Sequence, residues 1–160
     1  MKLGVKLKFL FFEHYWWMLC MVLAFTVAIL IWRKEPTPTV ATAIGAIISF
    51  IYLVQKQKLE ELRLFRELFK DFNERYDEMN EKLARIADRQ GGEVSSDERE
   101  TLVDYFNLCG EEHLYFQRGY IDPAVWRAWL NGMKAIVSVP HIKTVWEQER
   151  QTDSYYGLPL

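Results

Sequence analysis

The chain has 160 residues, of which 50% are hydrophobic and 26% are charged, and its formal net charge is −2 at pH 7. This balance argues against a strongly basic nucleic-acid-binding surface, and the length left after two membrane spans suffices for one small domain. The cysteines, Cys20 and Cys109, fall in different parts of the chain, so we expect no disulfide between them.

Two stretches without a charged side chain, residues 15–32 and 39–54, lie near the N-terminus. Each approaches the length of about 20 residues with which a helix crosses a bilayer. Tyr and Trp residues flank the first stretch, and such rings favour the headgroup region. The second stretch extends to residue 55 if the lysines after it reach the interface. The pattern predicts a transmembrane hairpin over residues 1–55, with spans of about 15–32 and 39–55.

The linker between the two stretches, residues 33–38, contains two prolines, which end one helix and turn the chain. Basic residues are more frequent before the first span and after the second than in this linker. The positive-inside rule therefore predicts a multi-pass protein of the bacterial inner membrane with both termini in the cytoplasm. Two alternatives are a cleaved signal peptide, for which small residues at cleavage spacing are missing, and a hairpin buried in a globular core.

Small residues recur every four positions on both spans and are the predicted transmembrane packing residues. They are Ala24, Ala28, Ala41, Gly45 and Ser49. Such spacing lets helix backbones approach closely, either to close the hairpin within one chain, which we favour, or to assemble copies. Residues 15–32 and 39–54 contain no acid, base or amide, so a transporter or a selective channel is not expected.

A heptad run follows the second span and predicts a long juxtamembrane amphipathic helix over residues 56–90. Its apolar positions are Leu62, Phe65, Phe69, Phe72, Tyr76, Met79, Leu83 and Ile86. Half of these residues are aromatic, whereas coiled-coil seams prefer Leu, Ile and Val. The run therefore favours packing against a folded domain, and a parallel stalk between copies is the alternative.

Residues 91–160 carry the signals of a cytoplasmic helical domain. Two glycines at 91 and 92 end the long helix, and Ser95 with Glu98 forms a capping-box pattern at the start of the next. Asp122 followed by Pro123 marks another helix start, and Ser138 to Pro140 a break. The aromatic tail after residue 153 is expected to dock on this domain. No alternating strand pattern occurs, so the whole chain is predicted to be all-α, with three to four helices in its cytoplasmic part.

The residues that could carry chemistry are few and lie close together: Cys109, Glu111, Glu112 and His113. They match no metal-ligand spacing, nucleophile motif or phosphate-binding loop. We therefore predict that the protein is not an enzyme and has no catalytic, cofactor-binding or metal-binding residues. Cys109 is expected in a core with His113 at its edge. The two glutamates are expected to pair with basic residues of the same domain, namely Arg118, Arg127 or Lys134.

Aromatic residues are unusually dense between residues 105 and 129 and again in the tail. Trp and Tyr dominate the energetics of protein interfaces, so the surplus predicts a partner-binding surface. The candidates are Tyr115, Tyr120, Trp126, Trp129, Tyr155 and Tyr156. A generous aromatic core is the equally weighted alternative.

Several segments resemble a recurring bacterial pattern: residues 68–83, 104–112, 119–129 and 154–157. Together they are similar to a family of small bacterial helical proteins that N-terminal spans often tie to membranes. The architecture also resembles the two-span effectors of anti-phage retron systems. That resemblance implies a toxin-like effector that a reverse transcriptase and its msDNA hold silent until infection, when it disrupts the membrane and arrests growth. The alternative function is a non-toxic scaffold that recruits a soluble partner to the membrane.

Overall fold

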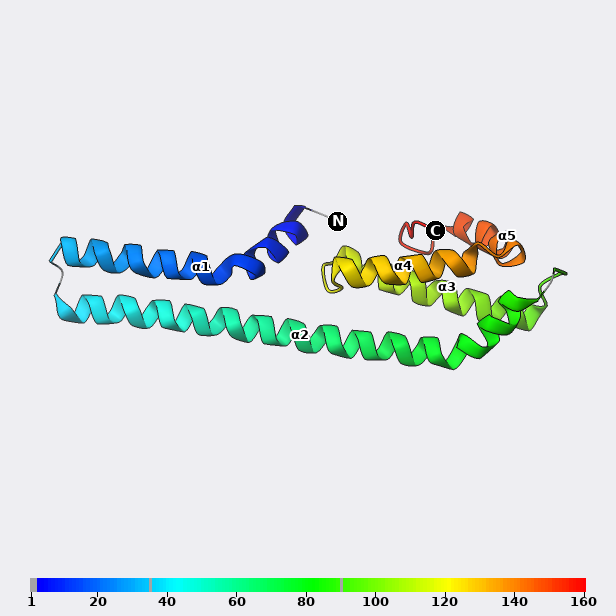
Figure 1. Cartoon of the computed structure of the whole chain (residues 1–160), viewed down its shortest axis with the longest axis horizontal. Coiled ribbons are helices and arrows are strands. Elements are labelled where there is room, and N and C mark those ends of the chain that lie inside the picture. Colours follow the sequence, from blue (N-terminus) through cyan, green and yellow to red (C-terminus); the bar gives the residue numbers. More distant parts are fainter. Residues whose placement is uncertain (1–2, 35, 90) are drawn as a thin grey trace. The chain divides into compact units, whose positions relative to one another are not determined.

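The computed structural model describes residues 3–34, 36–89 and 91–160 (Figure 1). Helix accounts for 84% of the chain and no strand occurs in these ranges, which confirms the predicted all-α class. The helices are α1 (Leu3–Trp32), α2 (Thr37–Asp88), α3 (Ser96–Gln117), α4 (Pro123–Val137) and α5 (Pro140–Glu149), followed by the 3-10 helix η1 (Arg150–Thr152).

Helix α1 begins well before the predicted span, because no proline interrupts the residues between Leu3 and the first aromatic cluster. It ends at a turn in which Lys34 adopts a left-handed backbone conformation, with φ of 53°. Pro38 lies in the first turn of α2, where the missing N–H of proline has no helical partner to lose. The two predicted prolines thus stand where the chain changes from one helix to the next.

The chain divides into two compact units, one ending at Arg63 and the other running from Leu64 to Leu160. Helix α2 is continuous and contributes its first part to the N-terminal unit and its last part to the C-terminal unit. The predicted boundary at residue 55 therefore falls within the N-terminal unit, and the segment 56–90 is shared between both.

In the N-terminal unit, the buried residues of α1 and α2 form one small cluster. Tyr15, Leu19 and Val54 are buried there, and three partly buried side chains pack against them: Phe11, Phe12 and Ile51. Nζ of Lys58 also lies over the Tyr15 ring, 5.1 Å from its centroid, in cation–π geometry.

The helix ends of the C-terminal unit follow the predicted local signals. Ser95 caps α3 and forms a capping box with Glu98, as predicted. The chain leaves α3 through Gly119, whose φ of 79° suits a residue without a Cβ. The Asp122 carboxylate accepts a hydrogen bond of 2.7 Å from the N–H of Ala124, which confirms the predicted start of α4 at Pro123. Helix α5 begins at Pro140, after the predicted break.

The heptad run of α2 packs within the chain from Phe69 onward, where the Phe69 ring stacks on that of Trp129. Phe72, Leu83 and Ile86 are buried in the core of the C-terminal unit, and Tyr76 and Met79 pack against that core. This confirms domain packing for that part of the run. Further core residues come from α3, α4 and α5, such as Leu102, Phe106, Met133, Ile142 and Trp146.

The remaining elements of this unit close around the core. Helix α5 contacts both α3 and α4, which also contact each other (Figure 1). The tail docks as expected, with Tyr155 and Leu158 buried. Two polar contacts hold the C-terminal end of α2 to neighbouring helices. The Nε2–H of His141 in α5 donates to the carbonyl oxygen of Ile86 at 2.7 Å, and Arg89, just after α2, pairs with Glu98 of α3 at 3.0 Å.

Candidate membrane-facing surface and cavity of the helical unit

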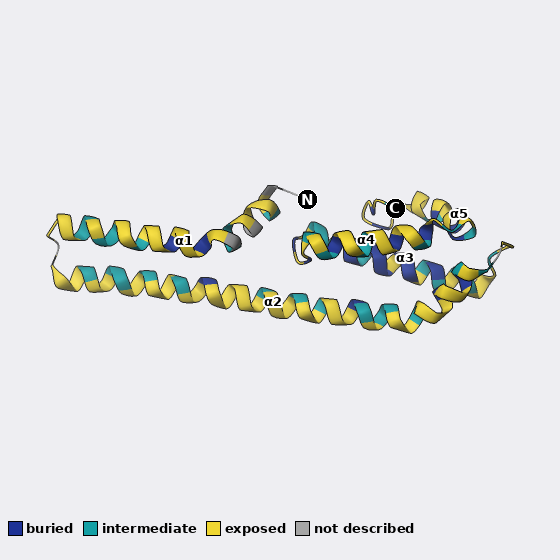
Figure 2. Cartoon of the chain, in the orientation of Figure 1, coloured by how far each residue is buried: buried dark blue, intermediate teal, exposed yellow. Residues whose placement is uncertain are grey.

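Two helices, α1 and α2, carry segments that are long and apolar enough to cross a membrane. Almost none of these segments is covered by other parts of the chain, and most of their surface is exposed in Figure 2. Large apolar side chains point outward along them, among them Trp17, Met21, Phe25, Ile31, Trp32, Ile48, Phe50 and Tyr52. Trp32 is 85% exposed. Contiguous exposed apolar surface of this extent marks a membrane or a protein interaction rather than a water-facing helix.

The five predicted packing residues are all exposed: Ala24, Ala28, Ala41, Gly45 and Ser49. A Cβ added at Gly45 would meet nothing within 4 Å. The buried cluster of the two helices is built around Tyr15, Leu19 and Val54 and includes none of these small residues, so their predicted role in closing the hairpin stays a prediction. Large rings and branched side chains fill the space between the helices, and the small residues lie outside it.

Two of the hydroxyl groups on the exposed part of α2 donate hydrogen bonds within the helix. Thr42 donates to the carbonyl oxygen of Pro38, and Ser49 donates to that of Gly45, each at 2.9 Å. A hydroxyl in an apolar solvent must find such a partner, because an unpaired one costs the full desolvation penalty. These two hydroxyl groups are thus compatible with a lipid environment.

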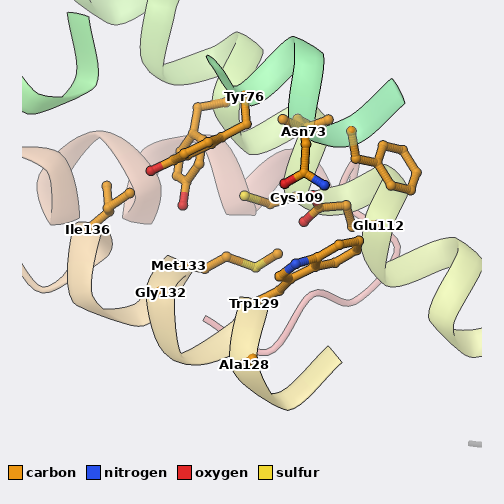
Figure 3. A pocket seen from close by; sticks show the side chains of 12 residues that line it. Asn73, Tyr76, Cys109, Glu112, Ala128, Trp129, Gly132, Met133 and Ile136 are labelled. Atoms are coloured by element: carbon orange, nitrogen blue, oxygen red, sulfur yellow. The ribbon is translucent and has the colours of Figure 1, made fainter. Parts of the chain in front are cut away.

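The C-terminal unit contains a cavity of about 330 Å³ between α2, α3 and α4 (Figure 3). Its apolar walls come mainly from aromatic rings and thioether or aliphatic chains, namely Phe72, Leu108, Trp129, Met133 and Ile136. Its polar lining consists of Asn73, Tyr76, Tyr105, Cys109 and Glu112. Figure 3 shows Asn73, Cys109 and Glu112 grouped on one side of the cavity, above Met133 and Trp129.

Glu112 is the charged group of this cavity and is only 8% exposed. Burial raises the pKa of its carboxyl to about 8, since desolvation penalises the ionised form. The nearby Arg75 guanidinium opposes this rise, and the charge of Glu111 adds to it. Among the described residues, no hydrogen bond or ion pair to the Glu112 carboxyl occurs. The carboxyl is therefore held largely protonated at neutral pH.

Glu111, the neighbour of Glu112, has a partner that the sequence did not predict. Arg75 donates two hydrogen bonds to its carboxylate, of 2.6 and 3.2 Å, and thereby joins α2 to α3. The predicted pairing of Glu111 and Glu112 with Arg118, Arg127 or Lys134 is wrong. Because Glu111 and Glu112 are consecutive on a helix, they point in different directions, one toward Arg75 and the other into the cavity.

Cys109 and His113 occupy the predicted positions, in the core and at its edge. Cys109 is buried, and burial raises the pKa of its thiol well above the usual range, so it is not a poised nucleophile. His113 stacks on Trp126 with ring centroids 5.1 Å apart, and burial lowers its pKa. No group of three or more His, Cys, Asp or Glu side chains suited to a metal ion occurs in the described part of the chain.

The structure separates the six aromatic partner-binding candidates by exposure. Trp126 and Tyr155 are buried in the core, and Tyr115 and Trp129 are partly buried against it. Tyr120 and Tyr156 are the exposed ones, and Tyr156 is 51% exposed with a left-handed φ of 55°. The aromatic surplus therefore builds mainly the core, and any surface role falls to Tyr120 and Tyr156.

Two residues of the cavity region were not singled out from the sequence. Asn73 lies beside the heptad positions 72 and 76, and Arg75 lies one residue before the second of them. A polar side chain next to an apolar seam was the available signal for Asn73. No comparable local signal marked Arg75, because its partner Glu111 is 36 residues away in the chain.

Comparison with known proteins gives no matching family model, no similar curated protein and no similar solved structure.

Proposed function

We propose that the chain is a bacterial inner-membrane effector that acts without catalysis. Its two apolar segments cross the bilayer as a hairpin, with both termini in the cytoplasm, and the C-terminal unit is a cytoplasmic helical bundle. The exposed apolar surface of α1 and of the first part of α2 carries this proposal. Exposing such an apolar surface to water costs free energy, about 25 cal/mol per Å², whereas exposing it to lipid does not.

The orientation rests on charge. Lysines and arginines lie before the first segment and after the second, and the loop between them carries only Arg33 and Lys34. The position of Lys58 over the Tyr15 ring agrees with an interfacial layer at the cytoplasmic ends of both spans.

The effector role rests on the unused small-residue face of α2. Ala41, Gly45 and Ser49 are exposed in a single chain, so this face is open to a second copy. Assembly of copies through it would disrupt the membrane and arrest growth. In the retron systems that the chain resembles, a cytoplasmic reverse transcriptase with its msDNA holds the effector silent. Here the C-terminal unit would bind such a partner, with Tyr120 and Tyr156 as contact residues.

Induced expression of the full chain in bacteria tests this function through a membrane-potential dye. The wild-type chain is expected to depolarise the cells. Gly45→Leu is expected to reduce the depolarised fraction several-fold, because the leucine blocks close approach of two backbones. The same variant is expected to leave the single chain folded, since Gly45 is exposed and a Cβ added there meets nothing within 4 Å.

Ala46→Leu is the matched control, because it adds bulk at the next position, about 100° around the helix. It is also exposed, and it should depolarise cells like the wild type. Equal effects of the two variants, or full toxicity of a chain that lacks residues 1–55, would overturn the effector proposal.

The second candidate function is a benign scaffold that recruits a soluble partner. The exposed Tyr156, held in a left-handed conformation that costs a non-glycine residue of order 1 kcal/mol, favours a contact role for the C-terminal unit. A scaffold predicts no growth defect on induction. It also predicts that replacement of the hairpin by an unrelated membrane anchor preserves recruitment, whereas an effector would lose its activity.

A further inference from the structure

The cavity of the C-terminal unit has the composition of a ligand site rather than of a packing defect. Its volume of about 330 Å³ is well above that of a missing side chain and lies at the lower end of small-molecule pockets. Packing defects in natural cores are small and apolar, and they stay dry. This cavity instead contains a carboxyl group, an amide and two phenols within apolar walls.

Glu112 is the feature that a structural role does not explain. The residue is only 8% exposed and lines the cavity, and no hydrogen bond or ion pair joins its carboxyl to another described residue. A largely buried carboxylate without a cationic partner costs free energy when it ionises, and a cation that enters the cavity offsets that cost. Arg75 does not serve as that partner, because its guanidinium binds Glu111 instead.

The walls identify the chemistry of the missing partner. Four aromatic rings line the cavity, those of Phe72, Tyr76, Tyr105 and Trp129. Aromatic faces attract organic cations and also accept apolar bodies. Among the described residues that line the cavity there is no Lys, Arg or His, so the cavity offers no positive charge to an anion. The Asn73 amide, on the same side as Glu112 in Figure 3, adds a hydrogen-bonding group beside the carboxyl.

We propose that this cavity binds a small organic ammonium ion with an apolar body, whose cationic head pairs with the Glu112 carboxylate and whose body lies against Trp129 and Phe72. Because α2, α3 and α4 all line the cavity, the ligand fastens the last part of α2 to its neighbours. This site does not depend on the effector role proposed above, and it is tested by binding alone.

Binding of the ammonium ion moves a proton. Before binding, the carboxyl holds its proton at pH 7, since its pKa is about 8. Pairing with a cation favours the carboxylate, so the proton leaves to solvent as the ligand enters. The charged groups that act on Glu112 are Arg75 on α2 and Glu111 on α3, which are paired with each other. The titratable groups that line the cavity with Glu112 are Tyr76 on α2 and Tyr105 and Cys109 on α3, all with pKa values raised by burial, and the lining residues of α4 are not titratable. Glu112 is thus the group that releases the proton.

The test uses the full-length chain in detergent micelles, with 2-phenylethylamine as the probe and 2-phenylethanol as its neutral isostere. Calorimetric titrations in two buffers of different ionisation enthalpy give both the affinity and the number of protons released. The amine is expected to bind with a dissociation constant below about 1 mM, which a ligand of this size can reach, and to release close to one proton at pH 7. The alcohol is expected to bind at least about tenfold more weakly, since it lacks the charged pair, and to release none.

Two variants locate the site. Glu112→Gln keeps the shape of the protonated carboxyl, so the fold is retained, and it should weaken amine binding at least about tenfold and abolish proton release. Gly132→Leu adds bulk to the cavity lining while Glu112 stays in place, and a Cβ added at residue 132 meets nothing within 4 Å. It should abolish binding of both compounds. Glu111→Gln is the matched control, because this neighbouring carboxyl does not line the cavity, and binding should persist.

Several results would overturn the proposal. They are equal affinity for the amine and the alcohol, unchanged amine binding by Glu112→Gln, and no binding of the amine at millimolar concentration. Tighter binding of N-acetyl-lysine methylamide than of 2-phenylethylamine would also overturn it, because the cavity would then suit a lysine side chain of a protein rather than a small ligand.

Discussion

At the scale of single residues, Glu112 shows how position on a helix decides the state of a charge. It and Glu111 have the same side chain and adjacent places in α3. Glu111 is partly exposed and paired with Arg75, whereas Glu112 is buried and unpaired. Burial outweighs the attraction of the nearby guanidinium, so the pKa of Glu112 rises to about 8.

This raised pKa makes the stability of the C-terminal unit depend on pH. Below the usual glutamate pKa of 4.5, the carboxyl is protonated in both folded and unfolded chains, and it costs no extra free energy. Between pH 4.5 and 8 the unfolded chain loses the proton and the folded chain keeps it, so the free energy of unfolding falls as pH rises. Above pH 8 the fall is complete.

Glu112→Gln is expected to remove this dependence. At pH 8 the variant should be more stable than the wild type by roughly 4 kcal/mol, since the pKa rises from 4.5 to about 8 and one pKa unit is worth about 1.4 kcal/mol. At pH 4 the two should be nearly equal. Guanidinium denaturation of the full chain in detergent, followed by far-UV circular dichroism at several pH values, measures the difference. A wild-type stability that rises from pH 5 to 8 relative to the variant would contradict the burial of an unpaired acid.

At the scale of elements, the ends and faces of helices could be predicted where the signal was local. The capping box at Ser95, the start of α4 at Asp122 and Pro123, and the break before α5 at Pro140 depend on residues a few positions apart, so the sequence alone sufficed. The Arg75–Glu111 pair and the lining of the cavity could not be predicted, because they join residues from different helices. The packing of the hairpin was also out of reach for the same reason. The four-residue spacing of small residues marks a face of each span, but it does not tell which residues of another helix that face contacts.

The heptad run of α2 gives a direct test at this scale. Phe72 is 2% exposed in the core, whereas Leu62 in the same run is 61% exposed. Phe72→Ala is expected to destabilise the C-terminal unit by about 3–5 kcal/mol, because it removes buried apolar surface and leaves a cavity. Leu62→Ala, the matched change at an exposed position, is expected to cost less than about 0.5 kcal/mol.

Denaturation of the two variants in detergent measures both costs. Similar destabilisation by Phe72→Ala and Leu62→Ala would show that the run is buried along its whole length, as in a stalk between copies.

At the scale of the whole molecule, the distribution of basic residues and the exposed apolar surface predict a defined membrane topology. Single cysteines introduced in a chain with Cys20 and Cys109 replaced by serine or alanine can report it. Arg33→Cys in the loop between α1 and α2 is expected to react with a membrane-impermeant maleimide in intact spheroplasts. This substitution also removes a positive charge from the outside loop, which reinforces the predicted orientation.

Glu93→Cys, in the exposed segment between α2 and α3, provides the opposite report. It is expected to react only after the membrane is permeabilised. Labelling of Glu93→Cys in intact spheroplasts, or protection of Arg33→Cys, would contradict the topology.

The hydrogen bonds that Thr42 and Ser49 make within α2 also affect how the proposed activity depends on the number of chains in the membrane. Because each hydroxyl already donates to a carbonyl of its own helix, contact between copies along this face would rest on close packing alone. Packing without interhelical hydrogen bonds gives weak association that follows mass action. An effector built this way is silent at low copy number in the membrane and becomes active above a threshold density. The amount of protein that is made would then control its activity as much as binding of an inhibitory partner.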